Sequence, residues 1–231
     1  MPDTSQTPDE ELVAAQARGL VSEITDESRL ERMRAELAMG FAALAGVRRT
    51  VSVFGSARTA AGTAEYDLAR LVGRRLGEAG FDVITGGGPG TMEAAHHGAH
   101  DAGARSIALN IDLAFEQAAD AWTDISLDFH YFFCRKVMFV RYASAFVVLP
   151  GGYGTLDELF EALCLIQTRK IRSFPVILVG TDYWSGLVAW LSERAAAEGK
   201  VDAAELDLMH VTDDLDWVVA RVVQAAAEQR A

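Results

Sequence analysis

From residue 48 onward, short apolar runs alternate with longer segments in which apolar residues recur every three or four positions. The short runs predict buried strands at 50–54, 81–85, 106–110, 145–149 and 175–179, and a further short apolar stretch lies at 208–211. The longer segments predict helices at 65–79, 91–102, 135–143, 156–170, 184–198 and 215–228. Helices alternating with continuously apolar strands predict an α/β fold, a Rossmann-like doubly wound parallel sheet covered on both faces.

The N-terminal 47 residues follow a different pattern. Residues 1–10 are polar and predict a frayed tail, whereas apolar residues at helical spacing over 11–47 predict two helices outside the main sheet. We therefore expect a flexible tail and helical extension over 1–47 and one Rossmann-like domain over 48–231.

Three of the expected strands end in loops rich in glycine or small residues, at 54–58, 85–91 and 150–155. In a doubly wound sheet such loops meet at the carboxyl edge of the strands, where ligands bind. Glycine lets the backbone approach a ligand closely, and the helix that follows presents unpaired N–H groups that favour a phosphate. Neither a complete G-x-G-x-x-G fingerprint nor a P-loop ending is present, so a mononucleotide or sugar phosphate fits these loops best.

Glu158 follows the third loop, in what we expect to be the first turn of the next helix. A carboxylate beside a phosphate is repelled unless it serves a positive charge or a hydroxyl on the same ligand. The residues Thr155 to Glu158 also fit a capping box, in which the glutamate only closes the start of its helix. The motif alone leaves both interpretations open.

Composition narrows the ligand class. A formal charge of −12 and a pI near 4.8 disfavour a nucleic-acid surface as a partner. The basic residues are arginines except Lys136, Lys170 and Lys200, which suits bidentate anion contacts. No apolar run is long enough for a membrane span and no signal peptide is evident, so we expect neither a membrane partner nor a location other than the cytoplasm.

Other candidate ligands are weaker. Cys134 and Cys164 lie in apolar helical patterns without metal-ligand spacing and are interpreted as core thiols. His96 and His100 share a helix face, but no third ligand is evident, so core or surface histidines are favoured over a metal site.

Two motifs, GGGPGTMEA at 86–94 and PGGYGTLDE at 150–158, together with the Arg135-Lys136 pair between them, resemble the LONELY GUY (LOG) family. Members of this family are cytokinin-activating phosphoribohydrolases, often mislabelled as lysine decarboxylases. The resemblance covers about residues 50–210. It implies a homodimer or a larger assembly of dimers that hydrolyses the N-glycosidic bond of a nucleoside 5′-monophosphate, without a cofactor or a metal.

The resemblance also assigns residues. The family's catalytic arginine and glutamate fall on Arg135 and Glu158. The substrate contacts that it implies are Ser56, Gly86, Gly87, Gly88, Gly90, Glu116, Lys136, Gly151, Gly152, Tyr153, Gly154 and Thr155.

The chemistry of the bond agrees with this assignment. Cleavage of a ribosyl–base bond builds positive charge on the sugar, which a carboxylate near C1′ stabilises. Two departures, an aromatic lead-in to Arg135 and the N-terminal extension, place the chain with longer bacterial members. The expected substrate is AMP or an N6-modified AMP such as a cytokinin ribotide. The alternative is a nucleotide sensor or a molybdenum-cofactor carrier, since related folds use a similar loop without hydrolysis. A lysine decarboxylase is a third and weaker hypothesis.

Overall fold

The structure is a computed structural model that describes residue 12, residues 25–112 and residues 121–229. Its centre is a seven-stranded sheet in which every pairing is parallel, in the order β4-β3-β2-β1-β5-β6-β7. The strands are β1 (Thr50–Phe54), β2 (Asp82–Thr85), β3 (Ser106–Ile111), β4 (Ile125–Phe129), β5 (Ala143–Val148), β6 (Val176–Val179) and β7 (Met209–Thr212). The predicted Rossmann-like doubly wound sheet is confirmed.

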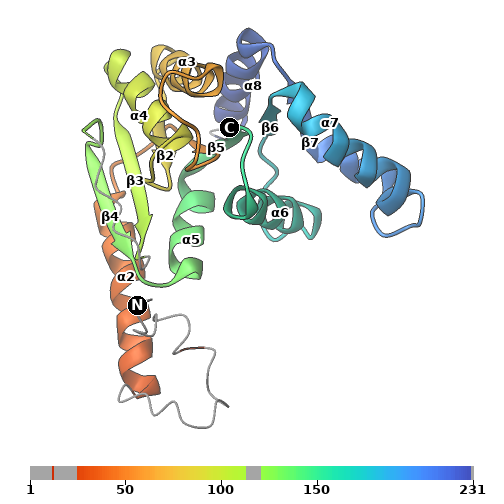
Figure 1. Cartoon of the computed structure of the whole chain (residues 1–231). Helices are drawn as coiled ribbons and strands as arrows, with labels where there is room; N and C mark the ends of the chain where they lie inside the picture. The colour runs from red at the N-terminus through yellow and green to blue at the C-terminus, as the bar shows by residue number, and fades with distance from the viewer. Residues whose placement is uncertain (1–11, 13–24, 113–120, 230–231) are drawn as a thin grey trace, which may run out of the picture.

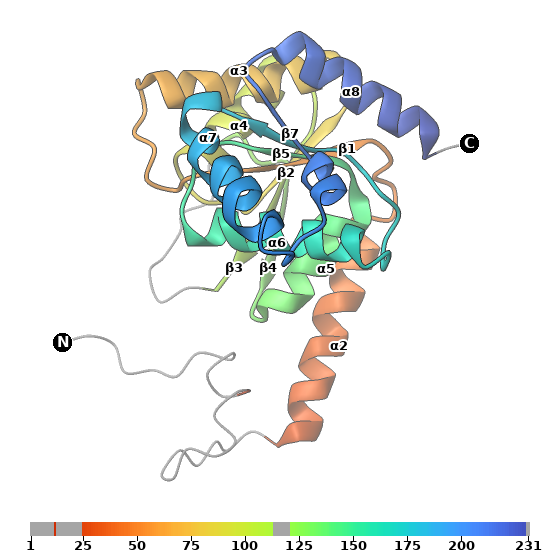
Figure 2. The same cartoon turned by 90° about the vertical axis from the view of Figure 1, so that its right-hand side faces the viewer.

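Helices cover both faces of this sheet (Figures 1 and 2). They are α2 (Asp26–Ala43), α3 (Ala64–Glu78), α4 (Thr91–Asp101), α5 (Phe132–Tyr142), α6 (Tyr153–Gln167), α7 (Thr181–Trp190) and α8 (Leu215–Glu228). A π-helical segment, Leu191–Ala196, continues α7, and a 3₁₀ segment, Ala203–Leu208, precedes β7.

Two apolar cores hold the layers together. One joins α3, α4 and α8 to one face of the sheet through residues such as Val51, Val72 and Val222. The other joins α5, α6 and α7 to the opposite face through residues such as Met138, Leu159 and Trp184. Strand side chains alternate between faces, which is why a strand buried on both sides, such as β6, reads as a continuous apolar run.

The strand order places a topological switch point between β1 and β5. From β1 the chain builds outward through β2, β3 and β4, and from β5 it builds in the opposite direction through β6 and β7. The loops that follow β1 and β5 therefore diverge and leave a crevice beyond the carboxyl ends of these strands.

Several elements differ from the sequence-based expectation. β4 was not predicted, because an edge strand that alternates buried and exposed residues, with Asp128 among them, carries little apolar signal. The last turns of the helix expected at 184–198 are π-helical. Three helices, α5, α6 and α7, each begin three residues before the expected start, at Phe132, Tyr153 and Thr181.

Within the N-terminal extension, α2 is the expected helix whose full course lies in the described part of the chain. The frayed tail over 1–10 and most of the other expected helix lie outside the described residues. Cys134 is buried as expected, but Cys164 is exposed, so its assignment to the core was wrong. No helix of the described residues is long and apolar enough to cross a membrane.

Candidate active site

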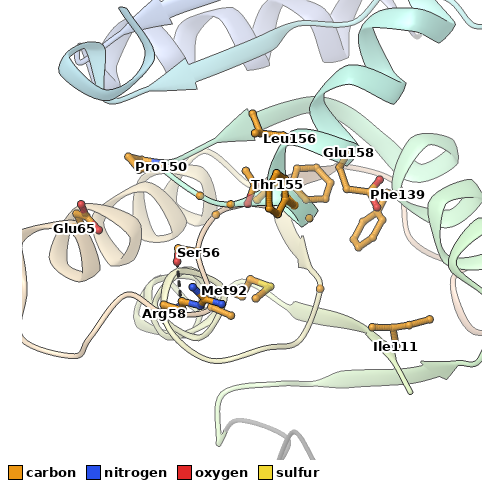
Figure 3. Close-up of a pocket in the computed structure, with 18 of the residues that line it drawn as sticks. Ser56, Arg58, Glu65, Met92, Ile111, Phe139, Pro150, Thr155, Leu156 and Glu158 are labelled. Atoms are coloured by element: carbon orange, nitrogen blue, oxygen red, sulfur yellow. Dashed lines mark hydrogen bonds between the residues drawn. The ribbon is translucent and has the colours of Figure 1, made fainter. Parts of the chain in front are cut away.

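A cavity of about 790 Å³ opens at the switch point between β1 and β5 (Figure 3). Glu158 and Phe139 lie toward one end of it, and Glu65 lies toward the other. Loops after β1, β2 and β5 contribute Ser56, Gly86 and 150–155 to its lining, and α5 contributes Arg135. This arrangement confirms the prediction that these loops converge at the carboxyl edge of the sheet.

Backbone hydrogen bonds hold the three loops together. The Ser56 N–H donates to the Pro150 carbonyl at 3.0 Å, and the Ser56 carbonyl accepts from the Thr91 N–H at 3.0 Å. From α7, the Tyr183 hydroxyl donates to the Gly151 carbonyl at 2.7 Å. Ser56 thus links the loop before α4 to the loop before α6, and the cavity floor is fixed before any ligand arrives.

The 86–90 loop uses its glycines for internal packing. Gly87 has φ +74°, and a Cβ atom there would lie 1.8 Å from Oδ1 of Asn110. Gly90 has φ +71°, and a Cβ atom there would lie 2.6 Å from the Ser56 carbonyl oxygen. Only glycine tolerates such conformations and contacts at low cost, so the fold itself requires both residues.

The 151–155 loop, which includes the first three residues of α6, uses two of its glycines differently. Gly151 packs against Thr155, but a Cβ atom at Gly152 or Gly154 would meet nothing within 4 Å, and neither residue has a positive φ. No side chain caps α6 at Gly152. Among the described residues, no acceptor is bonded to the N–H groups of Tyr153 and Gly154. This loop presents free donors at the positive end of a helix dipole, an arrangement suited to an anion.

The start of α6 resolves the ambiguity over Glu158. Because Gly152 is the N-cap, Thr155 lies within the first turn and cannot be the N-cap of a capping box, so that alternative was wrong. Glu158 lies in the second turn, not in the first turn as expected, and is 4 % exposed. Glu158 and Glu36 are the only buried carboxylates of the described residues.

Lys136 lies among three carboxylates of α6. Its Nζ is 2.6 Å from Oε2 of Glu161, 2.8 Å from Oδ2 of Asp157 and 3.3 Å from Oε1 of Glu158. Burial alone would lower the pKa of Lys136, but its ion pairs raise the pKa above the usual lysine value. The ammonium is therefore a fixed positive charge beside Glu158.

At Glu158, in contrast to Lys136, burial outweighs the neighbouring charges in setting the direction of the pKa shift. Burial raises the pKa of its carboxyl above the usual value, and the nearby charges of Lys136 and Arg135 oppose that rise without cancelling it. Oε1 of Glu158 faces the Lys136 ammonium at 3.3 Å. A buried carboxylate on a cavity wall, beside one fixed positive charge, is suited to accept a proton or a ligand hydroxyl.

Arg135 extends from the first turns of α5 into the same cavity. Its guanidinium carbon lies 5.1 Å from the ring centroid of Phe132 and 5.5 Å from that of Phe139, and its Nη1 donates to the Leu109 carbonyl at 3.5 Å. Burial lowers the pKa of Arg135, and the carboxylates of Glu158 and Asp157 counteract this. Nε has no partner among the described residues, which leaves donor capacity for a ligand.

The structure brings most of the expected site residues to the cavity. Those that line it are Ser56, Gly86, Arg135, Gly151, Gly152, Tyr153, Gly154, Thr155 and Glu158. Gly87, Gly88 and Gly90 are buried behind this lining, and Lys136 faces the α6 carboxylates. Glu116 lies outside the described residues.

Several lining residues were not anticipated from the sequence. Arg58 and Glu65 add a second pair of opposite charges, and Met92 and Ile111 join Phe132 in an apolar wall. Arg58 carries a weak signal, since it ends the strand-to-loop stretch at 54–58 that was singled out. Tyr183, from α7, had none, because only the tertiary fold brings it to Gly151.

The histidines are engaged elsewhere. His96 is fully buried, with Nδ1 3.1 Å from Oγ1 of Thr123 and Nε2 3.0 Å from Oγ1 of Thr85. The ring of His97 stacks on Trp122, with centroids 3.9 Å apart, and the His100 ring lies 5.1 Å from the same side chain. The described residues hold no cluster of three or more potential metal ligands.

Comparisons with known proteins show the family of the chain. A family profile described as "possible lysine decarboxylase" matches residues 92–222. A probable cytokinin riboside 5′-monophosphate phosphoribohydrolase of Oryza sativa subsp. japonica is 30% identical over 190 residues, covering 79% of this chain and 80% of that protein. A cytokinin riboside 5′-monophosphate phosphoribohydrolase of Rhodococcoides fascians is 28% identical over 181 residues, covering 75% and 89%.

A solved structure is similar in fold. The molybdenum cofactor carrier protein of Chlamydomonas reinhardtii superposes with a TM-score of 0.57 at 24% identity, covering 78% of this chain and 99% of that one. At this identity the similarity concerns the arrangement of helices and strands.

Proposed function

The chain belongs to the LONELY GUY (LOG) family, and from that premise we propose that it hydrolyses the N-glycosidic bond of a nucleoside 5′-monophosphate to free base and ribose 5-phosphate. The substrate that we propose is AMP or an N6-modified AMP. One observation carries the proposal: α6 begins with an uncapped, open glycine loop and carries a buried carboxylate in its second turn.

These two features lie at a useful separation. Glu158 is five residues beyond Tyr153, a rise of about 7.5 Å along a helix axis. That is the scale of one sugar phosphate. A 5′-phosphate held by the free N–H groups of the 151–155 loop therefore places the ribose beside Glu158, so that binding energy remote from the bond positions the reacting atoms.

In the proposed reaction the bond between C1′ and the base nitrogen breaks with its electron pair on the base. The bond between C1′ and a water oxygen forms, and one water proton goes to Glu158. The departing base takes a proton from solvent and Glu158 then releases its proton to solvent, so that one water is consumed. Ionised Glu158 stabilises the positive charge that develops on the sugar, as carboxylates do in glycoside hydrolysis. Arg135, on the same cavity wall, clamps the ribose or phosphate or assists the departing base.

Lys136 takes a supporting role in this proposal. Its ammonium lies 3.3 Å from Glu158 and lowers the cost of a carboxylate that burial would otherwise neutralise. The contacts with Asp157 and Glu161 hold it in place. This differs from the substrate contact that the resemblance implies for Lys136, and the two roles predict different effects of mutation.

We also propose that the chain assembles at least as a homodimer. Phe132, Phe133 and Val137 on α5 and Phe160 on α6 are each 38–41% exposed, beside the cavity. An obligate interface buries on the order of 2,000 Å² or more of largely apolar surface. Light scattering should therefore give at least twice 25.0 kDa, and a monodisperse, fully active species near 25 kDa would contradict the assembly.

Two rival functions make different demands on the site. A cofactor carrier shares the fold with this chain, but a carrier has no need of the Arg135 and Glu158 pair on the cavity wall. A lysine decarboxylase that uses pyridoxal phosphate needs a lysine at the cofactor. None of the three lysines lines the cavity of the described residues: Lys136 is paired with carboxylates, and Lys170 and Lys200 are exposed.

Incubation with a panel of nucleoside 5′-monophosphates, with the released base read by chromatography, tests the proposal. Release from AMP or N6-modified AMP supports hydrolysis. Binding of the panel without release of any base would instead favour a sensor or carrier.

A further inference from the structure

Helix α2, in the extension before the sheet, packs against α5, the helix that carries Arg135. Figures 1 and 2 show the C-terminal part of α2 beside the sheet and its N-terminal part projecting beyond it. The contact is close at Gly40, where a Cβ atom would lie 2.7 Å from Sδ of Met138. The Met33 carbonyl, two turns earlier, accepts from Sγ of Cys134 at 3.9 Å.

Glu36 lies between these two contacts and is 6 % exposed. Its Oε2 accepts from the N–H groups of His130 and Tyr131, at 3.2 and 3.3 Å. Its Oε1 lies 3.0 Å from Nδ1 of His130. A carboxylate buried in an otherwise apolar contact is costly unless such donors compensate it, so its position points to a specific task.

That task is set by where α5 begins. The N-cap of α5 is Tyr131, and no side chain of its own segment caps it. Glu36 reaches this end from a different helix and places a negative charge at the positive end of the α5 dipole. It thus pairs the N–H of the N-cap residue itself, one of the donors left without an intrahelical partner at a helix start, from outside the segment of α5.

Two residues near the N-terminal end of α5 line the cavity. Phe132 and Arg135 are the first and fourth residues of the helix. Both line the cavity, and they contact each other, with the guanidinium carbon 5.1 Å from the ring centroid. If the first turn of α5 frays, both side chains lose their position. We infer that Glu36 is a positioning residue for Arg135 and that the N-terminal helix α2 is a built-in part of the active site. The inference rests on the proposed function for its effect on turnover.

The test compares Glu36→Ala and Glu36→Gln with Glu31→Ala. Glu31 lies on the same helix but is exposed and paired with Arg34, so it serves as the matched control. Loss of a helix cap corresponds to about a 3- to 30-fold effect, and we expect Glu36→Ala to lower kcat for AMP by this factor with a smaller change in KM. Glu36→Gln keeps one acceptor and should fall between Glu36→Ala and the wild type, and Glu31→Ala should match the wild type.

Amide hydrogen exchange gives a readout that does not depend on any substrate. The amides of 131–135 should exchange faster in both Glu36 variants, whereas those of the first turn of α6 should not change. Should Glu36→Ala fail to fold, Glu36→Gln decides on both readouts.

Two outcomes separate this inference from the proposed function. Folded Glu36 variants with wild-type protection at 131–135 and wild-type kcat would overturn the positioning role of Glu36. Faster exchange at 131–135 in a protein that releases base from no nucleotide would uphold the contact of Glu36 with the start of α5 and reject the proposed hydrolysis.

Discussion

The two glycine loops, 86–90 and 151–155, look alike in sequence but play different parts in the structure. In the first, glycines accommodate positive φ angles and contacts with Asn110 and the Ser56 carbonyl. In the second, Gly152 and Gly154 face open space with ordinary φ angles, at the uncapped start of α6. A glycine that neither the backbone conformation nor the packing requires is explained by something that approaches from outside the fold.

From this difference we expect the 86–90 loop to have a structural role and the 151–155 loop to contact the ligand. The 86–90 loop supports the cavity by holding Ser56 and Thr91, whose backbones are hydrogen-bonded to each other. The 151–155 loop forms the cavity wall and leads directly to Glu158. Mutations in the first loop should therefore act mainly on stability, and mutations in and after the second should act mainly on substrate.

The largest effect is expected at Glu158. Glu158→Gln should lower kcat by about 10²–10⁴, the range for a positioned acid–base or charge-stabilising group. Because burial raises the pKa of Glu158, the ionised form opposes folding above the unfolded-state pKa, so the glutamine variant should be at least as stable at neutral pH. Steady-state kinetics and thermal melts check both parts.

The matched control for Glu158 is Glu93→Gln, in the first turn of the helix that follows the 86–90 loop. Glu93 is outside the cavity lining, so its variant should keep wild-type turnover. Near-wild-type hydrolysis by Glu158→Gln would remove the catalytic assignment.

Arg135 should be nearly as sensitive. Arg135→Ala should lower kcat/KM by about 10²–10³, as expected when a preorganised donor is removed. Arg135→Lys should recover only part of this loss, because a lysine cannot reproduce a planar, bidentate contact. Variants that melt early yet turn over normally while folded would assign Arg135 a structural role.

The comparison of the loops is tested most sharply by one glycine from each. Gly90→Ala places a methyl group against the Ser56 carbonyl at positive φ and should cost about 2–5 kcal/mol of unfolding free energy. Gly154→Ala should leave stability unchanged or raise it by up to ~1 kcal/mol, since alanine favours a helix. It should lower kcat/KM for AMP about 10- to 100-fold, the equivalent of one charge-assisted hydrogen bond.

Denaturant titrations and kinetics on the two glycine variants give the answer. If both variants lost stability alike and bound AMP alike, the division between a supporting and a recognising loop would be wrong.

A smaller effect is expected on the pH profile. The proposed mechanism needs ionised Glu158, so kcat/KM should fall as pH drops through a pKa above the usual glutamate value. Lys136→Met removes a charge that lowers that pKa, and should move the acidic limb to higher pH, whereas Lys136→Arg should leave it nearly in place. A raised KM with an unmoved limb would show instead that Lys136 contacts the substrate.

The sequence predicted the parts of the fold that depend on local pattern. The bounds of β1 and α8 match the expectation, because a short run rich in β-branched residues and helical periodicity are strong signals. β4 was missed because edge strands are only half buried. The start of α6 was misplaced because Thr155 imitates an N-cap, whereas the actual N-cap is a glycine without a capping side chain.

The sequence predicted which residues form the site but not the long-range contacts that hold them in place. The motifs indicated Arg135, Glu158 and the 151–155 loop, all of which line the cavity. The long-range contacts of Tyr183 with Gly151, and of Glu36 with the start of α5, join residues 32 and about 95 positions apart. No local pattern encodes such pairs, since only the sheet topology brings them together.

The claim that the 151–155 loop anchors the 5′-phosphate is tested most directly by a comparison of AMP with adenosine as substrates. Base released per unit time is measured by chromatography. If the 151–155 loop holds the 5′-phosphate, two or three charge-assisted hydrogen bonds are lost with adenosine, and kcat/KM should fall by about 10²–10⁴. The same ratio should shrink in Gly154→Ala, whose loop binds phosphate less well. Equal specificity constants for AMP and adenosine would contradict the account, because the ribose would then reach Glu158 without its anchor.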